Sequence, residues 1–199
     1  MQFQSRPIVA MALAGLLASQ PVSAIACQPP ETAEISAPDS ARMSDFLVSR
    51  SRGLSAALLS PAEIDRRAVS TLFSNGDGAI EAIPDGAYRC RTIKMGGILP
   101  LTVYGFFACS VSEGGTRIDK TTGSQRFSGT LYPLEGAVFY RGALHYGNEG
   151  PMAYNADAER NQVGCIYRAP GDEITSYRLE LPAPLFESVH DVIELVPAD

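Results

Sequence analysis

Hydrophobic and polar positions follow two different patterns along the chain, one before residue 76 and one after residue 85. From Gly86 onward, short segments rich in Val, Ile, Thr, Tyr and Phe alternate with turns that contain Gly or Pro. This pattern is typical of antiparallel β-structure, because the turn residues let the chain reverse and the residues between them favour extended backbone. The expected strands are Ala87–Met95, Tyr104–Ser112, Thr116–Thr121, Gln125–Tyr132, Ala137–His145, Gln162–Arg168, Ile174–Leu181 and Phe186–Val196.

Residues 43–75 have the spacing of amphipathic helices instead. Ser60 is a capping residue followed by Pro61 and Glu63, a combination that favours the start of a helix. We therefore expect two helices, the second beginning at Ser60-Pro61. The apolar positions are Met43, Phe46, Leu47, Leu54, Leu58 and Leu59 in the first helix and Ile64, Ala68, Leu72 and Phe73 in the second.

The expected fold class is α+β, with two N-terminal helices followed by an eight-strand antiparallel meander. A meander of eight strands can close into a small barrel, which removes its exposed edges. An open or half-closed sheet packed on the two helices is the alternative. We expect one domain over residues 43–199, helical over 43–75 and β over 84–197, after a flexible arm over residues 27–42 in which Pro residues oppose regular structure.

The first 26 residues resemble a secretory signal peptide. Arg6 precedes the apolar run 8–18, and small residues follow it, with cleavage expected after Ala24 or Ala26. The run is too short to span a bilayer as an anchor. The expected location is therefore the periplasm or outside the cell. Cleavage after Ala26 would leave Cys27 as the first residue, where a lipid could be attached, although the residues before Cys27 fit the lipoprotein pattern poorly.

An exported chain is expected to have paired cysteines, and four cysteines allow three pairings. The register that sets Met95 opposite Tyr104 also sets Cys90 opposite Cys109, at an α-carbon distance of about 4.5 to 5.5 Å that suits a disulfide. We expect this bridge, with two buried free thiols as the alternative. Cys165 would then bond Cys27, if the N-terminal arm reaches it, or stay reduced. A lipid on Cys27 would prevent that second bridge.

The charge of the chain excludes some classes of partner. It contains 22 acidic and 16 basic residues, for a formal net charge of −6. Nucleic acids and anionic membranes require a basic surface, so neither is expected as a partner. No later segment is long and apolar enough to predict a transmembrane helix.

Four segments carry a resemblance to a known family. They are Gly86–Met95 with its Arg-Cys-Arg-Thr-Ile-Lys core, Tyr104–Cys109, Thr122–Arg126 continuing through Gly129–Pro133, and Phe186-Glu187-Ser188 with Asp191–Leu195. Over residues 44–197 the chain resembles a family of uncharacterised exported proteobacterial proteins of similar length that share a domain of unknown function. The resemblance brings no activity with it. Cys165 and His190 stand where apolar residues are expected in relatives, so it implies no general role for either.

Catalytic and metal-binding motifs are weak in this sequence. The two histidines, His145 and His190, fall on different expected strands, and the cysteines are more simply explained as disulfides. A triad of Ser124, His190 and Asp191 is not expected, because adjacent residues of a strand point to opposite faces. We therefore expect no catalytic residue, no metal and no cofactor.

Basic and aromatic residues share several expected strands and form the best candidate site. The basic residues are Arg89, Arg91, Lys94, Arg126 and Arg141. Inward arginines in a small barrel could bind a carboxylate or phosphate, with aromatic side chains around the rest of the ligand. The alternative is that the arginines point outward and pair with acids such as Glu113, Asp119 and Glu135. The candidate ligand-binding residues are Arg89, Arg91, Gln125, Arg126, Tyr140 and Arg141.

These observations favour a non-enzymatic, exported binding module for a small amphipathic or anionic ligand. The alternative is an inhibitor or scaffold that contacts another protein of the cell envelope through the loop Gly147–Asp157. An enzyme that uses Glu187, Asp191 and the arginines is a third hypothesis.

Overall fold

The computed structural model describes residue 2 and residues 27–74, 76–169 and 175–198. The expected signal peptide, the turn Pro170-Gly171-Asp172 and Ile174 lie outside the described residues. In chain order the elements are η1 (Glu31–Ala33), α1 (Ala37–Ser44), α2 (Phe46–Ala57), α3 (Glu63–Phe73), β1 (Gly86–Met95), β2 (Leu101–Val103), β3 (Phe107–Ser112), β4 (Arg117–Lys120), β5 (Gln125–Pro133), β6 (Val138–Tyr146), η2 (Ala158–Arg160), β7 (Asn161–Ala169), β8 (Ser176–Pro182) and β9 (His190–Pro197).

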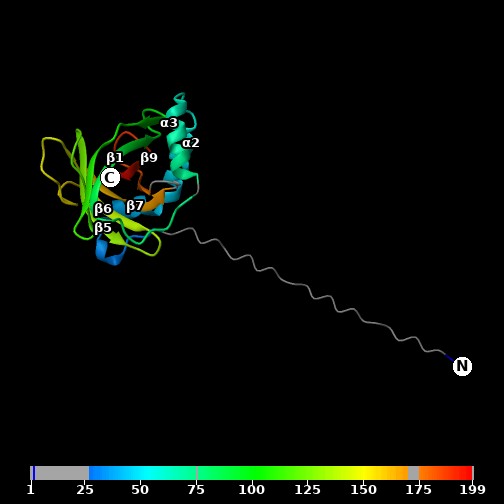
Figure 1. Ribbon diagram of the computed structural model, residues 1–199, viewed down its shortest axis with the longest axis horizontal. Helices are drawn as coiled ribbons and strands as arrows, with labels where there is room; N and C mark the ends of the chain where they lie inside the picture. Colours follow the sequence, from blue (N-terminus) through cyan, green and yellow to red (C-terminus); the bar gives the residue numbers. More distant parts are fainter. Residues whose placement is uncertain (1, 3–26, 75, 170–174, 199) are drawn as a thin grey trace.

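The strands form a closed antiparallel barrel. Each strand from β3 to β9 pairs with the next, and β1 closes the circle by pairing with β9 from Tyr88 opposite Pro197 to Met95 opposite His190. Figure 1 shows β1 and β9 side by side where the sheet closes. The expected α+β fold with an eight-strand meander is confirmed, with β2 as one extra strand. Closure leaves few unpaired strand edges.

The expected strand Tyr104–Ser112 is divided in two. Residues Gly86–Cys90 of β1 pair with β3, whereas Ile93–Met95 of the same edge pair with β2. The register changes by one residue between these two pairings, as at a β-bulge, and residues 104–106 lie between the two short strands. The last strand also begins later than expected, at His190 instead of Phe186.

The disulfide between Cys90 and Cys109 is present, with its α-carbons 5.8 Å apart. The register that led to it was wrong, since Cys109 lies opposite Tyr88 and Cys90 lies opposite Phe107. A shift of two residues keeps every side chain on its face of the sheet, so both cysteines still point the same way. The error arose because the chain turns at residues 96–100, earlier than the pattern indicated.

The N-terminal arm is fixed to the barrel wall. Cys27 is bonded to Cys165 of β7, with α-carbons 6.1 Å apart. A sulfur atom in a disulfide cannot carry a lipid, so this structure corresponds to the bridged alternative. The prediction of a flexible arm was wrong, because α1 begins at Ala37, with Ser36 as its capping residue and Pro38 in its first turn. Proline at that position favours a helix start.

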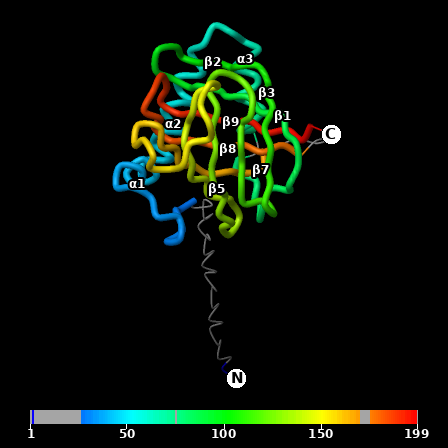
Figure 2. The backbone as a smooth tube through the Cα atoms, turned by 90° about the vertical axis from the view of Figure 1, so that its left-hand side faces the viewer, coloured from blue at the N-terminus to red at the C-terminus, as the bar shows by residue number. Residues whose placement is uncertain are grey.

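Helices α2 and α3 pack on the outside of the barrel (Figure 1), while Figure 2 shows α1 lower on the barrel than α3. The apolar faces expected for them were partly wrong, because Leu58, Leu59 and Ile64 are more than 70% exposed. The buried positions of α2 include Ser49 and Gly53. A side chain at Gly53 would collide with His190, so close packing here requires small residues. Helix α3 begins at Glu63, three residues after Ser60.

Apolar residues form one core inside the barrel and two outside it. The inner core includes Tyr88, Cys90, Ile118 and Leu179. One outer cluster lies where the N-terminal arm covers β6 and β7, and the other where α2 and α3 cover β1 and β9. Among the described helices, none combines the length and apolar character needed to cross a bilayer.

Candidate functional site

Strand β1 separates the expected site residues between the two faces of the barrel wall. Tyr88 and Cys90 belong to the inner core, so the alternation places Thr92 and Lys94 inside as well. Arg89 and Arg91 point outward, where both guanidinium groups lie over the ring of Phe106, at 5.4 and 4.8 Å from its centroid. Arg91 also forms an ion pair with Glu194 of β9.

The other two arginines also point outward. Arg126 donates a hydrogen bond from Nε to the carbonyl of Gly123, at 3.0 Å. Arg141 donates to the carbonyl of Ala33 and stacks on Tyr154, which fixes the N-terminal arm. The hypothesis of inward arginines is therefore wrong for all four. The outward alternative describes them, although the acids expected as their partners differ from those observed.

Two of the candidate residues do point inward. The side chain of Tyr140 is fully buried, and its hydroxyl lies 3.2 Å from Oε1 of Gln162. Gln125 lines a cavity of about 300 Å³ that opens at one end of the barrel. The structure therefore does not bring the six candidate residues together at one site.

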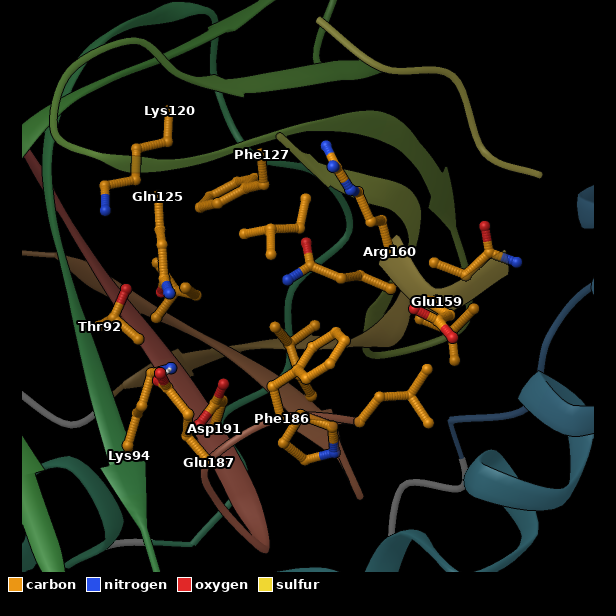
Figure 3. Close-up of a pocket in the computed structure, with 18 of the residues that line it drawn as sticks. Thr92, Lys94, Lys120, Gln125, Phe127, Glu159, Arg160, Phe186, Glu187 and Asp191 are labelled. Carbon is orange, nitrogen blue, oxygen red and sulfur yellow. Dashed lines mark hydrogen bonds and ion pairs between the residues drawn. The ribbon is translucent and has the colours of Figure 1, made fainter. Parts of the chain in front are cut away.

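This cavity has a polar side and an apolar side, and the strands from β4 to β9 contribute to it together with β1. In Figure 3, Lys94, Lys120, Gln125 and Asp191 lie at the left, Glu159 and Arg160 lie at the right, and Phe127 and Phe186 lie above and below the middle. The polar lining includes Thr92, Lys94, Lys120, Gln125, Gln162 and Asp191. The apolar lining includes Phe127, Leu144, Val163, Leu181, Phe186 and Ile193.

The loop between β8 and β9 covers part of the cavity and supplies one of its charges. Glu187, with its backbone at a φ of 70°, forms an ion pair with Nζ of Lys94. Asp191 accepts a hydrogen bond from the Ser188 hydroxyl at 2.5 Å. Burial raises the pKa of Asp191 to about 6, against the opposing effects of that hydrogen bond and of Lys94. An acid that titrates near neutral pH therefore lies beside the cavity.

Lys120 is the least satisfied charged group of the cavity. No carboxylate of the described residues lies within ion-pair distance of its amine, which sits 4.5 Å from the centroid of the Phe107 ring. Burial lowers the pKa of Lys120 to about 8, and the positive charges of Lys94 and Arg126 add to this effect. A cation in this position is available to an anionic group that enters the cavity.

Sequence reasoning grouped Lys94 with the candidate arginines but did not assign it to the inner face, and it missed Lys120. For Lys94, a signal was present, because it lies four residues after Cys90 and therefore on the same face of β1. For Lys120, the corresponding signal is the apolar Ile118, which is two residues earlier and fully buried in the inner core. Once one inward residue is known on a strand, alternation assigns every other side chain of that strand to the inner or the outer face.

A second charged cluster lies outside the barrel, beneath α2. Glu180 of β8 accepts two hydrogen bonds from Arg50, at 2.7 and 2.9 Å, and one from Arg178, at 2.6 Å. Both guanidinium groups also pair with Asp77. His190 contacts Glu180 at 3.0 Å through Nε2. Burial alone would raise the pKa of Glu180, but His190 and the two arginines lower it to about 2.

This cluster includes a Ser-His-Glu chain, since the Ser49 hydroxyl lies 2.9 Å from Nδ1 of His190. All three side chains are buried beneath α2, and none of them lines the barrel cavity. His190 and Asp191 lie on opposite faces of β9, as expected for neighbours in a strand. The geometry fits a structural contact between helix and barrel and leaves no room for a substrate.

The loop expected to contact a partner is held by the N-terminal arm. The hydroxyl of Tyr154 accepts a hydrogen bond from the Ser36 amide at 2.9 Å and contacts the buried carboxylate of Asp39.

Within the described residues, no three His, Cys, Asp or Glu side chains gather as a metal site.

Comparisons of the chain with curated proteins and with solved structures gave no match. A family model matches residues 32–195, which include α1 and most of the barrel, and its description is Domain of unknown function (DUF4893). This match confirms the resemblance to an uncharacterised family. The chain therefore belongs to the DUF4893 family.

Proposed function

We propose that the protein is a binding module for a small amphipathic ligand with an anionic group, held in the cavity at the end of the barrel. The observation that carries this proposal is the amine of Lys120, which lines the cavity and has no carboxylate partner within the part of the chain that the structure describes. A buried cation is costly unless it is paired, so an incoming anion would relieve that cost.

The rest of the cavity supports an amphipathic ligand. Its volume of about 300 Å³ lies at the lower end of the range of small-molecule sites. Phe127, Leu181 and Ile193 offer an apolar wall for a short hydrocarbon or ring system. Lys94 already forms an ion pair with Glu187, so the anionic group of the ligand would bind at Lys120 or displace Glu187 from Lys94.

The test is a calorimetric titration of the purified protein with decanoate, 1-decanol and decyltrimethylammonium, which share a chain length and differ in charge. We expect decanoate to bind at least about tenfold more tightly than the other two, because a charge-assisted hydrogen bond contributes about 1.5 to 3 kcal/mol. Lys120→Met should remove this preference. The matched control is Arg126→Met, which removes an outward charge and should change the affinity less than about twofold.

Equal affinity for the three amphiphiles would contradict the proposal. So would an equal loss of decanoate affinity in the two variants, because it would assign the effect to the net charge of the protein and not to the cavity. Circular dichroism of each variant establishes that the barrel is intact.

We also propose that the protein is exported. The residues before Cys27 have the pattern of a signal peptide, and the two disulfides suit an oxidising compartment. Cell fractionation followed by the intact mass of the recovered protein tests this. Recovery from the cytoplasm with residues 1–24 still attached would contradict export.

Contact with another envelope protein is a second candidate function, on a different surface from the one expected. Leu58 and Leu59 at the end of α2 and Ile98 between β1 and β2 are at least 75% exposed. Exposed apolar side chains of this kind are common in interaction surfaces. Cross-linking in intact cells should trap a partner from a photoreactive residue at Leu59, and an equal yield from the exposed Glu63 would contradict a specific surface.

A further inference from the structure

The two lysines of the chain share one cavity. Of the 16 basic residues, only Lys94 and Lys120 are lysines, and all the others are arginines. Both lysines line the barrel cavity, where they are 8% and 6% exposed. Arginine keeps its proton under all conditions that a folded protein meets, whereas a buried lysine can lose it. The only side chains of this chain that carry a primary amine therefore lie in one cavity.

Lys120 has the surroundings of a reactive amine. Its Nζ lies against the ring of Phe107, and the nearby charges that affect it are the cations Lys94 and Arg126. With a pKa lowered to about 8, about one molecule in ten has a neutral Lys120 at pH 7, compared with about one in three thousand for an ordinary lysine. Burial beside another cation is a recognised way of making a lysine nucleophilic.

Lys94 differs from Lys120 although it shares the same cavity. Its amine donates to the carboxylate of Glu187, so it is already engaged in an ion pair. Among the described residues, the cavity thus combines one amine with a carboxylate partner and one amine without, and the latter points toward the side where Thr92 and Gln125 lie (Figure 3).

We propose that Lys120 captures an aldehyde or ketone group of the ligand as a reversible imine. This inference rests on the proposed function and adds a carbonyl group to the chemical class of the ligand. The neutral amine attacks the carbonyl carbon, the carbonyl oxygen gains a proton, and the nitrogen loses one to give a carbinolamine. The hydroxyl group then takes up a proton and leaves as water while the carbon–nitrogen double bond forms.

The cavity also contains an acid for the last of these proton transfers. Asp191 lines the same cavity, and burial raises its pKa to about 6, so part of the population is protonated at neutral pH. Its hydrogen bond from Ser188 fixes the orientation of the carboxyl group. Imine formation exchanges one carbonyl oxygen for nitrogen and releases water, so it needs no oxidant or reductant.

The experiment traps the imine with a small anionic aldehyde. The purified protein, with both disulfides formed, is incubated at pH 8 with equimolar pyridoxal 5′-phosphate and reduced with cyanoborohydride. Peptide mapping by mass spectrometry then measures labelling at Lys94, Lys120 and the N-terminal amine. We expect Lys120 to be labelled at least about tenfold faster than Lys94, and its labelling rate to rise with pH up to about 8 and then level off.

Two variants separate the charge of Lys120 from its nucleophilicity. Lys120→Arg keeps the positive charge but has no amine that can form an imine, so it should lose labelling at this site. Lys94→Arg should still be labelled at Lys120. Excess decanoate should slow the labelling of the unmodified protein at least about fivefold, since both compounds occupy one cavity.

Labelling that is equal at the three amines, or that favours Lys94 or the N-terminus, would overturn the inference. If decanoate binds and Lys120 is not labelled, the inference fails and the proposed function stands. If Lys120 is labelled and decanoate neither binds nor competes, the proposed function fails, and with it the inference that a ligand of this class is captured.

Discussion

The two charged clusters of this protein lie on opposite sides of the same barrel wall, and adjacent residues of β9 belong to each. His190 joins the outer cluster, in which Glu180 and Asp77 each contact both Arg50 and Arg178. Asp191 joins the inner group, in which Lys120 has no acid partner among the described residues. In the outer cluster, the ion pairs attach a helix to the barrel. In the inner group, a cation without a carboxylate partner lies beside a cavity and is available to a ligand.

Removing the central acid of the outer cluster should have the largest effect. In Glu180→Gln, two buried guanidinium groups lose one of the two carboxylates that they share, which should reduce the free energy of unfolding by about 3 to 5 kcal/mol. Urea unfolding at pH 7 measures this. The matched control is Glu63→Gln, which breaks an exposed pair with Arg67 and should cost less than about 0.5 kcal/mol.

The pH dependence of the free energy of unfolding gives a sharper test of the role of Glu180. The pKa of Glu180 is lowered in the folded state, so its contribution is present above the unfolded value near 4.5 and is lost as pH falls toward 2. Glu180→Gln should therefore lose this acid-dependent step. Equal stability of Glu180→Gln and Glu63→Gln would show that the outer cluster does not hold the helices on the barrel.

Asp191→Asn should change the free energy of unfolding by a smaller amount and in the opposite direction. The pKa of Asp191 is raised to about 6, so its contribution to stability is present below the unfolded value of 3.8 and is lost as pH rises through 6. The variant should therefore be more stable than the wild type at pH 7, by about 1 to 3 kcal/mol, and equal to it near pH 4. Urea unfolding at the two pH values measures this difference, and the same offset at both would indicate altered packing instead of a buried charge.

Arg91→Met should have the smallest effect. Its ion pair with Glu194 lies on the outer face of the barrel wall, and neither side chain lines the cavity. Affinity for decanoate should change less than about twofold, as measured by calorimetry. A loss as large as that of Lys120→Met would move the binding site from the inner to the outer face of the wall.

The sequence was a good guide to the strands and a poor guide to their faces. Turn residues marked most strand ends to within one or two residues, because their backbone preferences are local. Alternation alone puts Arg91 and Lys94 on opposite faces of β1, but which face points inward depended on contacts between distant strands and could not be assigned in advance. The disulfide partner of Cys90 was predicted in spite of a wrong register, because a shift of two residues preserves the face.

The helices show a similar limit. The apolar pattern placed Leu58 and Ile64 in the core, yet both are exposed, while Ser49 and Gly53 are buried. Burial of Ser49 depends on its contact with His190, which lies 141 positions away. Polar clusters built from segments that are distant in sequence leave no periodic signal, so the outer cluster around Glu180 could not be predicted.

The confinement of both lysines to one cavity has a practical consequence for work on this protein. Amine-reactive dyes, biotin esters and amine-coupled sensor surfaces would find only the N-terminus and the two cavity residues as targets. A preparation labelled in this way would risk having its own cavity blocked. Screening for ligands should therefore attach the protein through a terminal tag and leave every amino group unmodified.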